Sequence, residues 1–596
     1  MINVVGFLKR IFTLLRAGHQ SGAPAVATWR SSKNLAQALA ACAALVLTGC
    51  GSHISYHPLP AMERSLGPAP TLLSHPTADP GHDIANPLRG QYEDLLEPLF
   101  PQGNPAQKRY AAWPDSDDGS LRVSWRQLQP IDPRTLPADA PDDRKFDFSA
   151  IDNALTELGN RNMRMTLRVY AYNSCCDASY PNNTNIGVPD WMAAVPGATT
   201  SYPAPLSGYA AGVRQVVPNW NDPNYLDAFS QLLAALGRRY DGDERLSVFE
   251  FSGYGDFSEN HIAFLRDSLG APGPSPHESV AKLGYFSQFR DQSITTPAIH
   301  KLVAANVNAF PHTQLVVNPE NPEIVRELFS DDVTKTLSAP VGIRSDCLGV
   351  YAPLPVWAES SASAYVQAGD PVVNTTKQRL ASAPVITEWC QLPDGTSPQS
   401  YYDKAVHDVL QYHVSMTASF NFPDRDSNSP MDPGLYALWA RANLSSGYRY
   451  SVDAQAGSES IHGTVATVPV VWTNCGAAAA TERWTPGYRL IDSSGAVVRT
   501  LPATVNLKTL VYNGTSEPRE AAAVAVTEPV RIDLTGLSPG HYSLRAYVSW
   551  QQHKPNALHV VNYPPMQLAR DGRDDSGAYP IAALDVTPDG VTVDRQ

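Results

Sequence analysis

Two glutamates, Glu259 and Glu388, each follow a short apolar run that is typical of a buried strand. Residues 246–252 precede the first glutamate and residues 383–387 precede the second. A carboxylate just past a buried strand lies at the strand's C-terminal end, which is the catalytic face of a (β/α)8 barrel. Glycoside hydrolysis needs two such carboxylates. The pair therefore predicts a retaining glycoside hydrolase in which Glu259 protonates the leaving oxygen and Glu388 attacks the anomeric carbon.

The first glutamate has rivals in its own segment. Glu250, Asp256 and Glu259 are three carboxylates close to the end of the same predicted strand. Glu250 belongs to the strand itself, where an ion pair with Arg168 or Arg344 is an alternative to catalysis. Asp256 competes with Glu259 for the role of the acid, whereas Glu388 is the one carboxylate in its segment.

Arginines recur at the ends of three predicted strands, as Arg126, Arg168 and Arg344. A nearby guanidinium lowers the pKa of a carboxylate, so these residues could hold the nucleophile ionised. They could equally form structural ion pairs across the barrel strands, and the sequence leaves the two interpretations open.

Polar and aromatic side chains gather near the same strand ends. Flat aromatic faces stack on sugar rings, and amides and carboxylates bind hydroxyl groups. The candidate substrate-binding residues are Arg168, Tyr170, Tyr254, Asp256, Asn260, Asn318, Asp346, Trp357, Trp389 and Asn421. Ordinary core packing is the alternative for each aromatic residue, and Trp389 and Tyr254 are the strongest candidates for sugar contacts.

The elements that must position these residues alternate between strands and helices. The predicted strands cover residues 87–90, 121–126, 163–170, 246–252, 314–318, 341–344, 383–387 and 416–421, and helical periodicity is clear at 148–158 and 225–240. Eight such alternations predict a (β/α)8 TIM barrel over residues 86–447. A doubly wound sheet usually has a glycine-rich phosphate turn after its first strand, and this chain has none there.

The chain changes character after the barrel. From residue 448 to 596 it shows short strand patterns separated by turn residues, including a hairpin turn at 492–495. Residues 537–542 resemble the corner before a late strand of immunoglobulin-like domains, with Tyr542 as the corner tyrosine. We therefore expect a C-terminal immunoglobulin-like β-sandwich.

The N-terminus has the features of an export signal. A basic region and an apolar stretch at 38–47 lead to Leu47-Thr48-Gly49-Cys50, which resembles a bacterial lipobox. This predicts a lipoprotein signal peptide over 1–49, lipidation of Cys50 and a flexible Pro-rich tether over 50–85. An ordinary secretory signal is the alternative. Because Gly51 follows the cysteine, we expect an exported bacterial lipoprotein anchored to the outer membrane, in the periplasm or on the cell surface.

Composition and cysteine usage limit the partners. The formal net charge is −13 and basic clusters are scarce, which argues against nucleic acid as a partner. The expected partners are a carbohydrate substrate and a membrane reached through Cys50. No spacing indicates a metal site, and we expect neither a metal nor another cofactor. Cys347 and Cys390 each follow a predicted strand and form a candidate disulfide, whereas a redox or metal role for the vicinal Cys175 and Cys176 is a weaker alternative.

Several motifs carry a resemblance to a known family. They are Asn86-Pro-Leu-Arg-Gly90, Trp220-Asn-Asp-Pro223, Gly253-Tyr-Gly-Asp256 with Ser258-Glu259, Gly342-Ile-Arg344 with Asp346-Cys-Leu-Gly349, and Gly447-Tyr-Arg-Tyr450. From residue 86 to the end, the chain resembles bacterial proteins grouped as domain of unknown function 4832. That resemblance implies a glycosidase-like barrel followed by a β-sandwich.

The barrel layout also resembles glycoside hydrolase clan A, which implies an acid/base after strand four and a nucleophile after strand seven. Members of the domain of unknown function 4832 family often have Trp-Gly-Glu where this chain has Phe257-Ser258-Glu259. Clan A usually places Asn before the first glutamate, where this chain has Ser258. These departures motivate an alternative hypothesis of a non-catalytic glycan-binding lipoprotein. A structural cell-envelope lipoprotein that docks partners through the sandwich is a third hypothesis.

Overall fold

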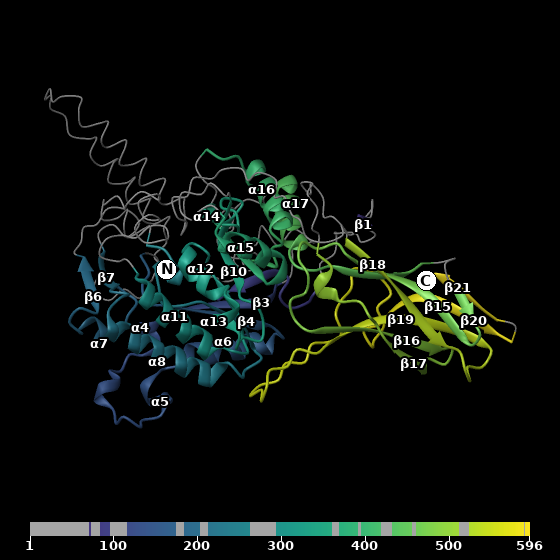
Figure 1. Cartoon of the computed structure of the whole chain (residues 1–596), viewed down its shortest axis with the longest axis horizontal. Coiled ribbons are helices and arrows are strands. Elements are labelled where there is room, and N and C mark those ends of the chain that lie inside the picture. Colours follow the sequence, from purple (N-terminus) through teal and green to yellow (C-terminus); the bar gives the residue numbers. More distant parts are fainter. Residues whose placement is uncertain are drawn as a thin grey trace.

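The computed structural model describes residues 71–72, 84–95, 116–174, 184–202, 213–262, 294–359, 369–390, 395–418, 432–455, 460–511, 524–588 and 590–595. The predicted signal peptide, Cys50, the pair Cys175–Cys176 and Asn421 lie outside these residues. Two units lie end to end, a barrel surrounded by helices and an elongated β unit that contains the C-terminus (Figure 1).

The first unit is a closed barrel of eight parallel strands, which confirms the predicted (β/α)8 TIM barrel. The strands are β2 (Gly90–Asp94), β3 (Ser116–Ser124), β4 (Arg164–Tyr170), β8 (Leu246–Glu250), β9 (Gln314–Val317), β10 (Gly342–Leu348), β11 (Val385–Trp389) and β12 (Met416–Ala418). Each strand pairs in parallel with the next, and β12 pairs with β2 to close the barrel. All eight C-terminal strand ends therefore meet at one face.

Helices follow most of these strands. The longer ones are α6 (Ser149–Asn160), α8 (Pro223–Tyr240), α11 (Thr296–Ala309), α12 (Pro322–Leu328), α15 (Pro371–Ser382), α16 (Pro398–Gln411) and α17 (Pro433–Ser445). Five of them begin with proline directly after a capping residue whose side chain accepts a backbone N–H. The capping residues are Asp222, Asn321, Asp370, Ser397 and Asp432. Proline has no N–H to leave unsatisfied at this position, so the sequence fixes where these helices start.

Short elements fill the connections. They are the helices α4 (Trp125–Leu128), α5 (Asp142–Lys145), α7 (Asp190–Ala193), α13 (Asp331–Thr334) and α14 (Val356–Glu359), with the 3-10 turns η2 (Pro133–Thr135) and η4 (Asp256–Ser258). A small sheet of β5 (Thr184–Ile186), β7 (Arg214–Pro218) and β6 (Thr199–Tyr202) lies between β4 and β8 in the chain.

Several predicted strand boundaries were wrong. Residues 87–89 form a turn in which Leu88 has a positive φ of 52°, and the first barrel strand begins only at Gly90. The second strand ends at Ser124, whose hydroxyl accepts the N–H of Gln127 and starts α4. Arg126 therefore lies on a helix and pairs with Asp190 near the surface. The sixth and seventh strands reach further than predicted, so that Asp346 and Glu388 lie on strands.

The barrel interior divides into an apolar layer and a charged layer, and the charged layer lies nearer the C-terminal ends of the strands. The apolar layer consists of Leu88, Tyr92, Val248, Val316, Ile386, Met416 and Ala418. Along β11, Ile386 lies in this layer and Glu388 comes two residues later, so alternation of side chains keeps Glu388 on the inner face. A larger apolar cluster between the strands and the surrounding helices holds the outer layer together.

The C-terminal β unit, residues 450–595, contains two five-stranded antiparallel sheets. One holds β1 (Thr71–Leu72), β13 (Tyr450–Ala454), β14 (Ser460–His462), β15 (Val465–Asn474) and β18 (Val524–Asp533), and the other holds β16 (Trp484–Asp492), β17 (Val497–Pro502), β19 (Gly540–Trp550), β20 (Tyr579–Thr587) and β21 (Gly590–Arg595). A 3-10 turn, η6 (Leu507–Thr509), is the one helical element among the described residues of this unit.

Both sheets contribute to one apolar core, to which Trp472 on β15 and Leu544 on β19 belong. This arrangement is consistent with the predicted sandwich. The Tyr542 hydroxyl donates to the carbonyl of Ser538 at 2.7 Å, which is the kind of bond that a corner tyrosine makes. The strand β1 falls within the predicted tether and pairs with β18.

The segment between β19 and β20 reaches back to the barrel, and we call residues 551–569 the clasp (Figure 1). Lys554 of the clasp donates through Nζ to the carbonyls of Asp243 at 2.9 Å and Leu246 at 3.0 Å. The Glu244 carboxylate accepts the backbone N–H groups of Lys554 and Val561. Because Leu246 is the first residue of β8, the clasp covers the N-terminal end of the barrel.

An arginine adds a second contact between the two units. Arg164, the first residue of β4, pairs with Glu482 at 2.7 Å and lies 5.3 Å from the ring centres of both Trp550 and Tyr563. The C-terminal β unit is therefore joined to the end of the barrel opposite Glu388.

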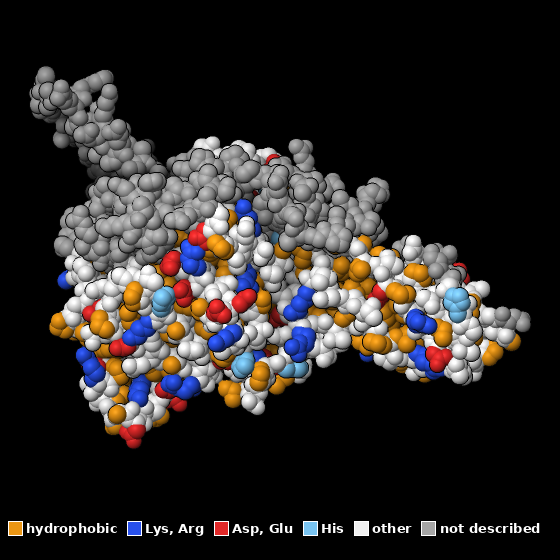
Figure 2. Space-filling view, viewed as in Figure 1, with side chains coloured by type: hydrophobic (Ala, Val, Ile, Leu, Met, Phe, Trp, Pro, Cys, Tyr) orange, Lys and Arg blue, Asp and Glu red, His pale blue; other side chains and the backbone are white. Residues whose placement is uncertain are grey.

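Acidic and basic side chains alternate over the visible face of the barrel (Figure 2). Among the described residues, no helix combines the length and apolar character needed to cross a membrane.

Candidate active site

Glu388 is held by two arginines from neighbouring and distant strands. Its Oε2 atom accepts from Nη2 of Arg122 on β3 at 2.6 Å and also from Nη2 of Arg344 on β10. Burial alone would raise the pKa of this carboxyl, but the guanidinium groups of Arg122, Arg344 and Arg168 lower the pKa to about 2. Glu388 is therefore ionised at any physiological pH, as a carboxylate nucleophile must be.

The arginines extend this pairing across the barrel. Arg168 Nε lies 2.5 Å from Oε2 of Glu250, and Arg344 Nε lies 3.5 Å from the same oxygen. Arg168 also donates through Nη1 to Glu259 at 2.7 Å. The resulting chain of alternating charges consists of Asp94, Arg122, Glu388, Arg344, Glu250, Arg168 and Glu259. Both interpretations of the strand arginines apply, because the same ion pairs that link the strands also keep Glu388 charged.

The loop after β8 brings Glu259 into this network through an unusual backbone. Gly253 and Gly255 have φ values of 118° and 88°, and the non-glycine residues Phe257, Ser258 and Asn260 have φ values of 49° to 61°. A Cβ atom on Gly255 would lie 2.6 Å from the carbonyl oxygen of His261, so only glycine fits there. Such clustered strain is typical of functional loops.

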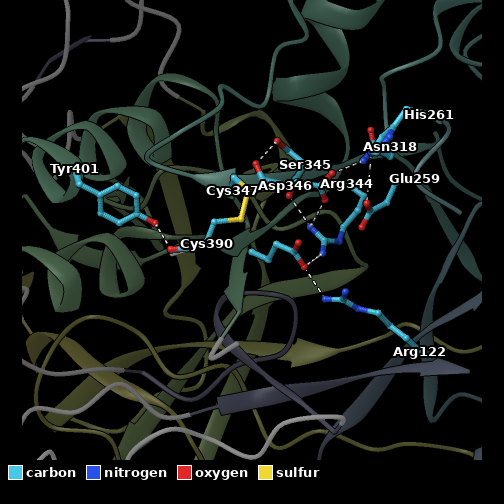
Figure 3. Close-up of a disulfide and its surroundings, with 11 residues drawn as sticks. Arg122, Glu259, His261, Asn318, Arg344, Ser345, Asp346, Cys347, Cys390 and Tyr401 are labelled. Atoms are coloured by element: carbon cyan, nitrogen blue, oxygen red, sulfur yellow. Dashed lines mark hydrogen bonds and ion pairs between the residues drawn. A yellow bond between two sulfur atoms is a disulfide. The ribbon is translucent and has the colours of Figure 1, made fainter. Parts of the chain in front are cut away.

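Three side chains converge at the end of this loop. Glu259, His261 and Asp346 each place one nitrogen or oxygen atom within 4.8 Å of the other two (Figure 3). Asn318 donates through Nδ2 to Asp346 at 2.7 Å, and His261 Nε2 lies 3.5 Å from Glu259. All three side chains of the cluster are buried.

The protonation states within this cluster differ from the ordinary ones. Burial raises the pKa of Asp346 well above its usual range, and the negative charges of Glu259 and Glu388 raise it further. Burial lowers the pKa of His261, but the hydrogen bond and charge of Glu259 raise it to about 9. These shifts favour the protonated forms of both Asp346 and His261.

The same three residues are those that could hold a divalent cation, since imidazole and carboxylate groups are common metal ligands. The surroundings already supply positive charge, however. Arg168 binds Glu259 directly, and Arg344 Nη1 lies 3.6 Å from Asp346. The donor set therefore has cationic partners without a metal.

Asp256, the rival for the acid role, is fixed by a different partner. Its two oxygens accept the backbone N–H of Ser174 at 2.8 Å and the Ser174 hydroxyl. Burial raises its pKa to about 7 in spite of these bonds. Its oxygens are thus occupied by the protein itself.

The two strongest aromatic candidates for sugar contacts, Trp389 and Tyr254, are both buried. Trp389 is fully buried, with its ring 6.0 Å from those of Tyr401 and Tyr402. Tyr254 is buried against Trp220 at 5.2 Å. These rings belong to the apolar core, which is the packing alternative that the sequence left open for each aromatic residue.

Other predicted contacts have protein partners. Trp357 is also buried and donates its indole N–H to the carbonyl of Pro319 at 2.8 Å. Asn260 donates to the carbonyl of Asn318 at 2.8 Å. Tyr170 ends β4 and lies 6.1 Å from the ring of Phe257. Asn421 lies outside the described residues.

Sequence reasoning missed Arg122, Asp94 and His261. Arg122 and Arg126 are four residues apart and would point to the same face of a strand that contained both. Because β3 ends at Ser124, only Arg122 lies on the strand. Asp94 ends a strand whose position was misjudged. His261 carries no pattern of its own beyond following Glu259 by two residues.

Comparisons with known proteins add little. No family model and no curated protein matches the chain, so its resemblance to domain of unknown function 4832 stays a prediction. Among solved structures, it is similar to endo-glycoceramidase II from Rhodococcus sp. in its lactosyl-enzyme intermediate, with a TM-score of 0.35, 11% identity and coverage of 76% of this chain and 98% of that one. A complex of endo-glycoceramidase II from Rhodococcus sp. with a cellobiose-like imidazole gives a TM-score of 0.33 at 12% identity, covering 70% and 89% of the two chains.

A bacterial fucosidase gives a TM-score of 0.23 at 7% identity, covering 71% of this chain and 79% of that one. At these scores the similarities carry no argument about function, and the strand pairing itself establishes the barrel.

Proposed function

We propose that this protein is a retaining glycoside hydrolase acting on a polysaccharide or oligosaccharide. The observation that carries the proposal is the contrast between two buried carboxyl groups on the adjacent strands β10 and β11. Guanidinium groups lower the pKa of Glu388 to about 2, whereas burial and neighbouring carboxylates raise the pKa of Asp346 well above its usual range. Pairs of carboxyl groups whose pKa values are pushed apart in this way serve as the base or nucleophile and the acid in glycosidases.

In the proposed reaction, Glu388 attacks the anomeric carbon as the glycosidic bond breaks, and the leaving oxygen takes a proton from the Glu259–Asp346 pair. Water then attacks the glycosyl-enzyme ester, and the pair recovers a proton from that water. The sequence favours Glu259 over Asp256 for the acid role. Asp346 joins Glu259 in that role here because the two side chains each place an oxygen within 4.8 Å of the other and burial raises the pKa of Asp346 well above its usual range.

The test is hydrolysis of a broad panel of aryl glycosides and oligosaccharides by the full chain. The proposal expects turnover by the wild type, product of retained anomeric configuration by proton NMR, and loss of turnover in Glu388→Gln. Wild-type rates for both Glu388→Gln and Glu259→Gln on a good substrate would exclude it.

Glycan binding without hydrolysis is a second candidate function, because catalytic carboxyl groups must reach the substrate and the three candidate groups are buried. The exposed fractions of Glu259, Glu388 and Asp346 are 0%, 1% and 7%. Oligosaccharide binding by calorimetry with no hydrolysis over the same panel would support this second function and exclude the first.

We also propose that the chain is an exported lipoprotein, anchored through Cys50, with an immunoglobulin-like C-terminal domain. The buried disulfide between Cys347 and Cys390 supports export, because stable disulfides form in oxidising compartments. Expression of Cys50→Ser, followed by membrane fractionation and metabolic labelling with an alkyne fatty acid, tests the anchor. Unchanged membrane association and labelling would exclude it.

A further inference from the structure

One disulfide joins the two strands that carry the contrasting carboxyl groups. Cys347 is the residue after Asp346 on β10, and Cys390 is two residues beyond Glu388 at the end of β11. Both cysteines are fully buried, and their Cα atoms are 4.7 Å apart. The predicted pairing of these two cysteines is confirmed, and the bond lies beside Arg344 and Asp346 (Figure 3).

The pairing of β10 with β11 is irregular at this point. Arg344 pairs with Ile386 and Ser345 with Thr387, but the next pair is Leu348 with Trp389. Two residues of β10, Asp346 and Cys347, therefore oppose a single residue of β11. Such a β-bulge re-aims side chains and is frequent next to active sites.

The backbone at the bulge is strained and held from several sides. Cys347 has a φ of 55°, a conformation that is unfavourable for a non-glycine residue and persists only when the surroundings enforce it. Its carbonyl accepts the N–H groups of Val350 and Tyr351, and the Tyr401 hydroxyl donates to the carbonyl of Cys390 at 2.9 Å. The disulfide is the one covalent link among these restraints.

We propose that the Cys347–Cys390 disulfide is a positioning element of the active site, which holds the bulge so that Asp346 stays on the inner face of the barrel beside Glu259 and Glu388. Its catalytic meaning rests on the proposed function. Reduction by a phosphine with water adds two electrons and two protons to the disulfide, gives two thiols, and converts the phosphine to its oxide. The freed end of β10 then lets Asp346 turn away from the two carboxylates.

The groups that face Asp346 determine what such a movement changes. They are Arg344 on its own strand, Glu388 on β11, Asn318 after β9, Arg168 on β4, and Glu259 with His261 in the loop after β8. Burial raises the pKa of Asp346 most, and Glu259 and Glu388 raise it further. An Asp346 that turns out of the buried site and away from these carboxylates is therefore expected to have a lower pKa.

The experiment compares three full-length proteins: the wild type, Cys347→Ser/Cys390→Ser, and Cys475→Ser as a control that removes a buried free thiol of the C-terminal β unit. The double variant is expected to lose about tenfold or more in kcat with little change in KM, and the basic limb of its pH profile should move to lower pH. If the double variant does not fold, Cys347→Ala/Cys390→Ala takes its place, because alanine leaves no unbonded hydroxyl group in these two fully buried positions.

A second readout does not depend on activity. The side-chain carbonyl of Asp346 is followed by 13C NMR, assigned through Asp346→Asn, and its apparent pKa is expected to fall by about one unit or more when the disulfide is absent. An unchanged titration overturns the positioning role, whatever the activity. A shifted titration together with full activity of Glu388→Gln means that the proposed function has failed while the positioning role stands.

Discussion

Nη2 of Arg122 lies 2.6 Å from Oε2 of Glu388, although the two residues are 266 positions apart in the chain. The contact exists because β3 and β11 both end at the same face of a closed barrel. The charge state of Glu388 therefore depends on Arg122 of β3, a strand whose end the sequence predicts two residues too late.

Replacing Arg122 with methionine should raise the pKa of Glu388 and destabilise the fold. Loss of one partner from a buried ion pair typically costs about 3–5 kcal/mol in the free energy of unfolding. Arg126→Met, which removes a more exposed pair with Asp190, should cost about 1 kcal/mol or less. Urea unfolding of both variants at pH 7 measures the difference, and equal losses would show that the buried pair has no special role.

The ion pair between Arg122 and Glu388 also makes the stability of the fold depend on pH in the acidic range. The pKa of folded Glu388 is about 2, below the ordinary value of about 4.3 for an unfolded glutamate. The stability that this group contributes is complete above pH 4.3 and is lost as the pH falls towards 2. In Arg122→Met this window should shrink, and the acid limb of any pH–rate profile should move upward.

Glu388→Gln should abolish hydrolysis, and Glu388→Gly should recover part of its activity with azide. The small anion replaces the missing carboxylate and yields a glycosyl azide of inverted configuration, which thin-layer chromatography and NMR detect. Glu93→Gln is the matched control, because Glu93 pairs with Arg161 on the same barrel outside the site. Hydrolysis by Glu388→Gln at the wild-type rate would rule out a nucleophilic role.

Leaving groups of different basicity should identify the proton donor. A dinitrophenyl leaving group needs no proton, so Asp346→Asn should keep much of its kcat/KM on that substrate and lose about 10²–10⁴-fold in kcat/KM on a sugar leaving group. Asp256→Asn should affect both substrates alike, because Ser174 occupies the Asp256 oxygens. The pattern reversed between these two variants would transfer the acid role to Asp256.

Asp118 on β3 should give the fold a pH dependence that has no link to catalysis. Burial raises its pKa to about 7, against about 3.9 in the unfolded chain. Between these values the folded state binds one more proton, so stability should fall by about 1.4 kcal/mol per pH unit as the pH rises from 4 to 7. Asp118→Asn should remove this fall of about 1.4 kcal/mol per pH unit from the pH dependence of the free energy of unfolding. Chemical unfolding of both proteins at pH 5, 6 and 7 measures the difference. Identical slopes in the two proteins would contradict the raised pKa.

The barrel could be predicted because its signals are local. Apolar runs such as 246–250 and amphipathic stretches such as 223–240 identify strands and helices within a few residues, and eight alternations leave few other folds. Glu388 was found for the same reason. The exact strand ends are less determined, and an error of two residues was enough to select Arg126 instead of Arg122.

The site's electrostatics could not be predicted in this way. Burial raises the pKa of Asp346, and the carboxylates of Glu259 and Glu388 raise it further. The residues next to 346 in the sequence do not indicate that these carboxylates lie nearby. The fate of Trp389 was equally undetermined, because a tryptophan beside a strand end has the same local sequence whether it packs on Tyr401 or faces a cleft.

The clasp bears on how the protein is made. A ribosome finishes the eight barrel strands at Ala418, yet Glu244 and Arg164 receive their partners only when residues 482–563 have followed. During synthesis the barrel therefore contains Glu244 and Arg164 before their partners in the C-terminal β unit exist. Partly folded intermediates are prone to aggregate. A chain stopped at residue 447 would lack these partners permanently, so we expect the isolated barrel to be less stable than the full chain.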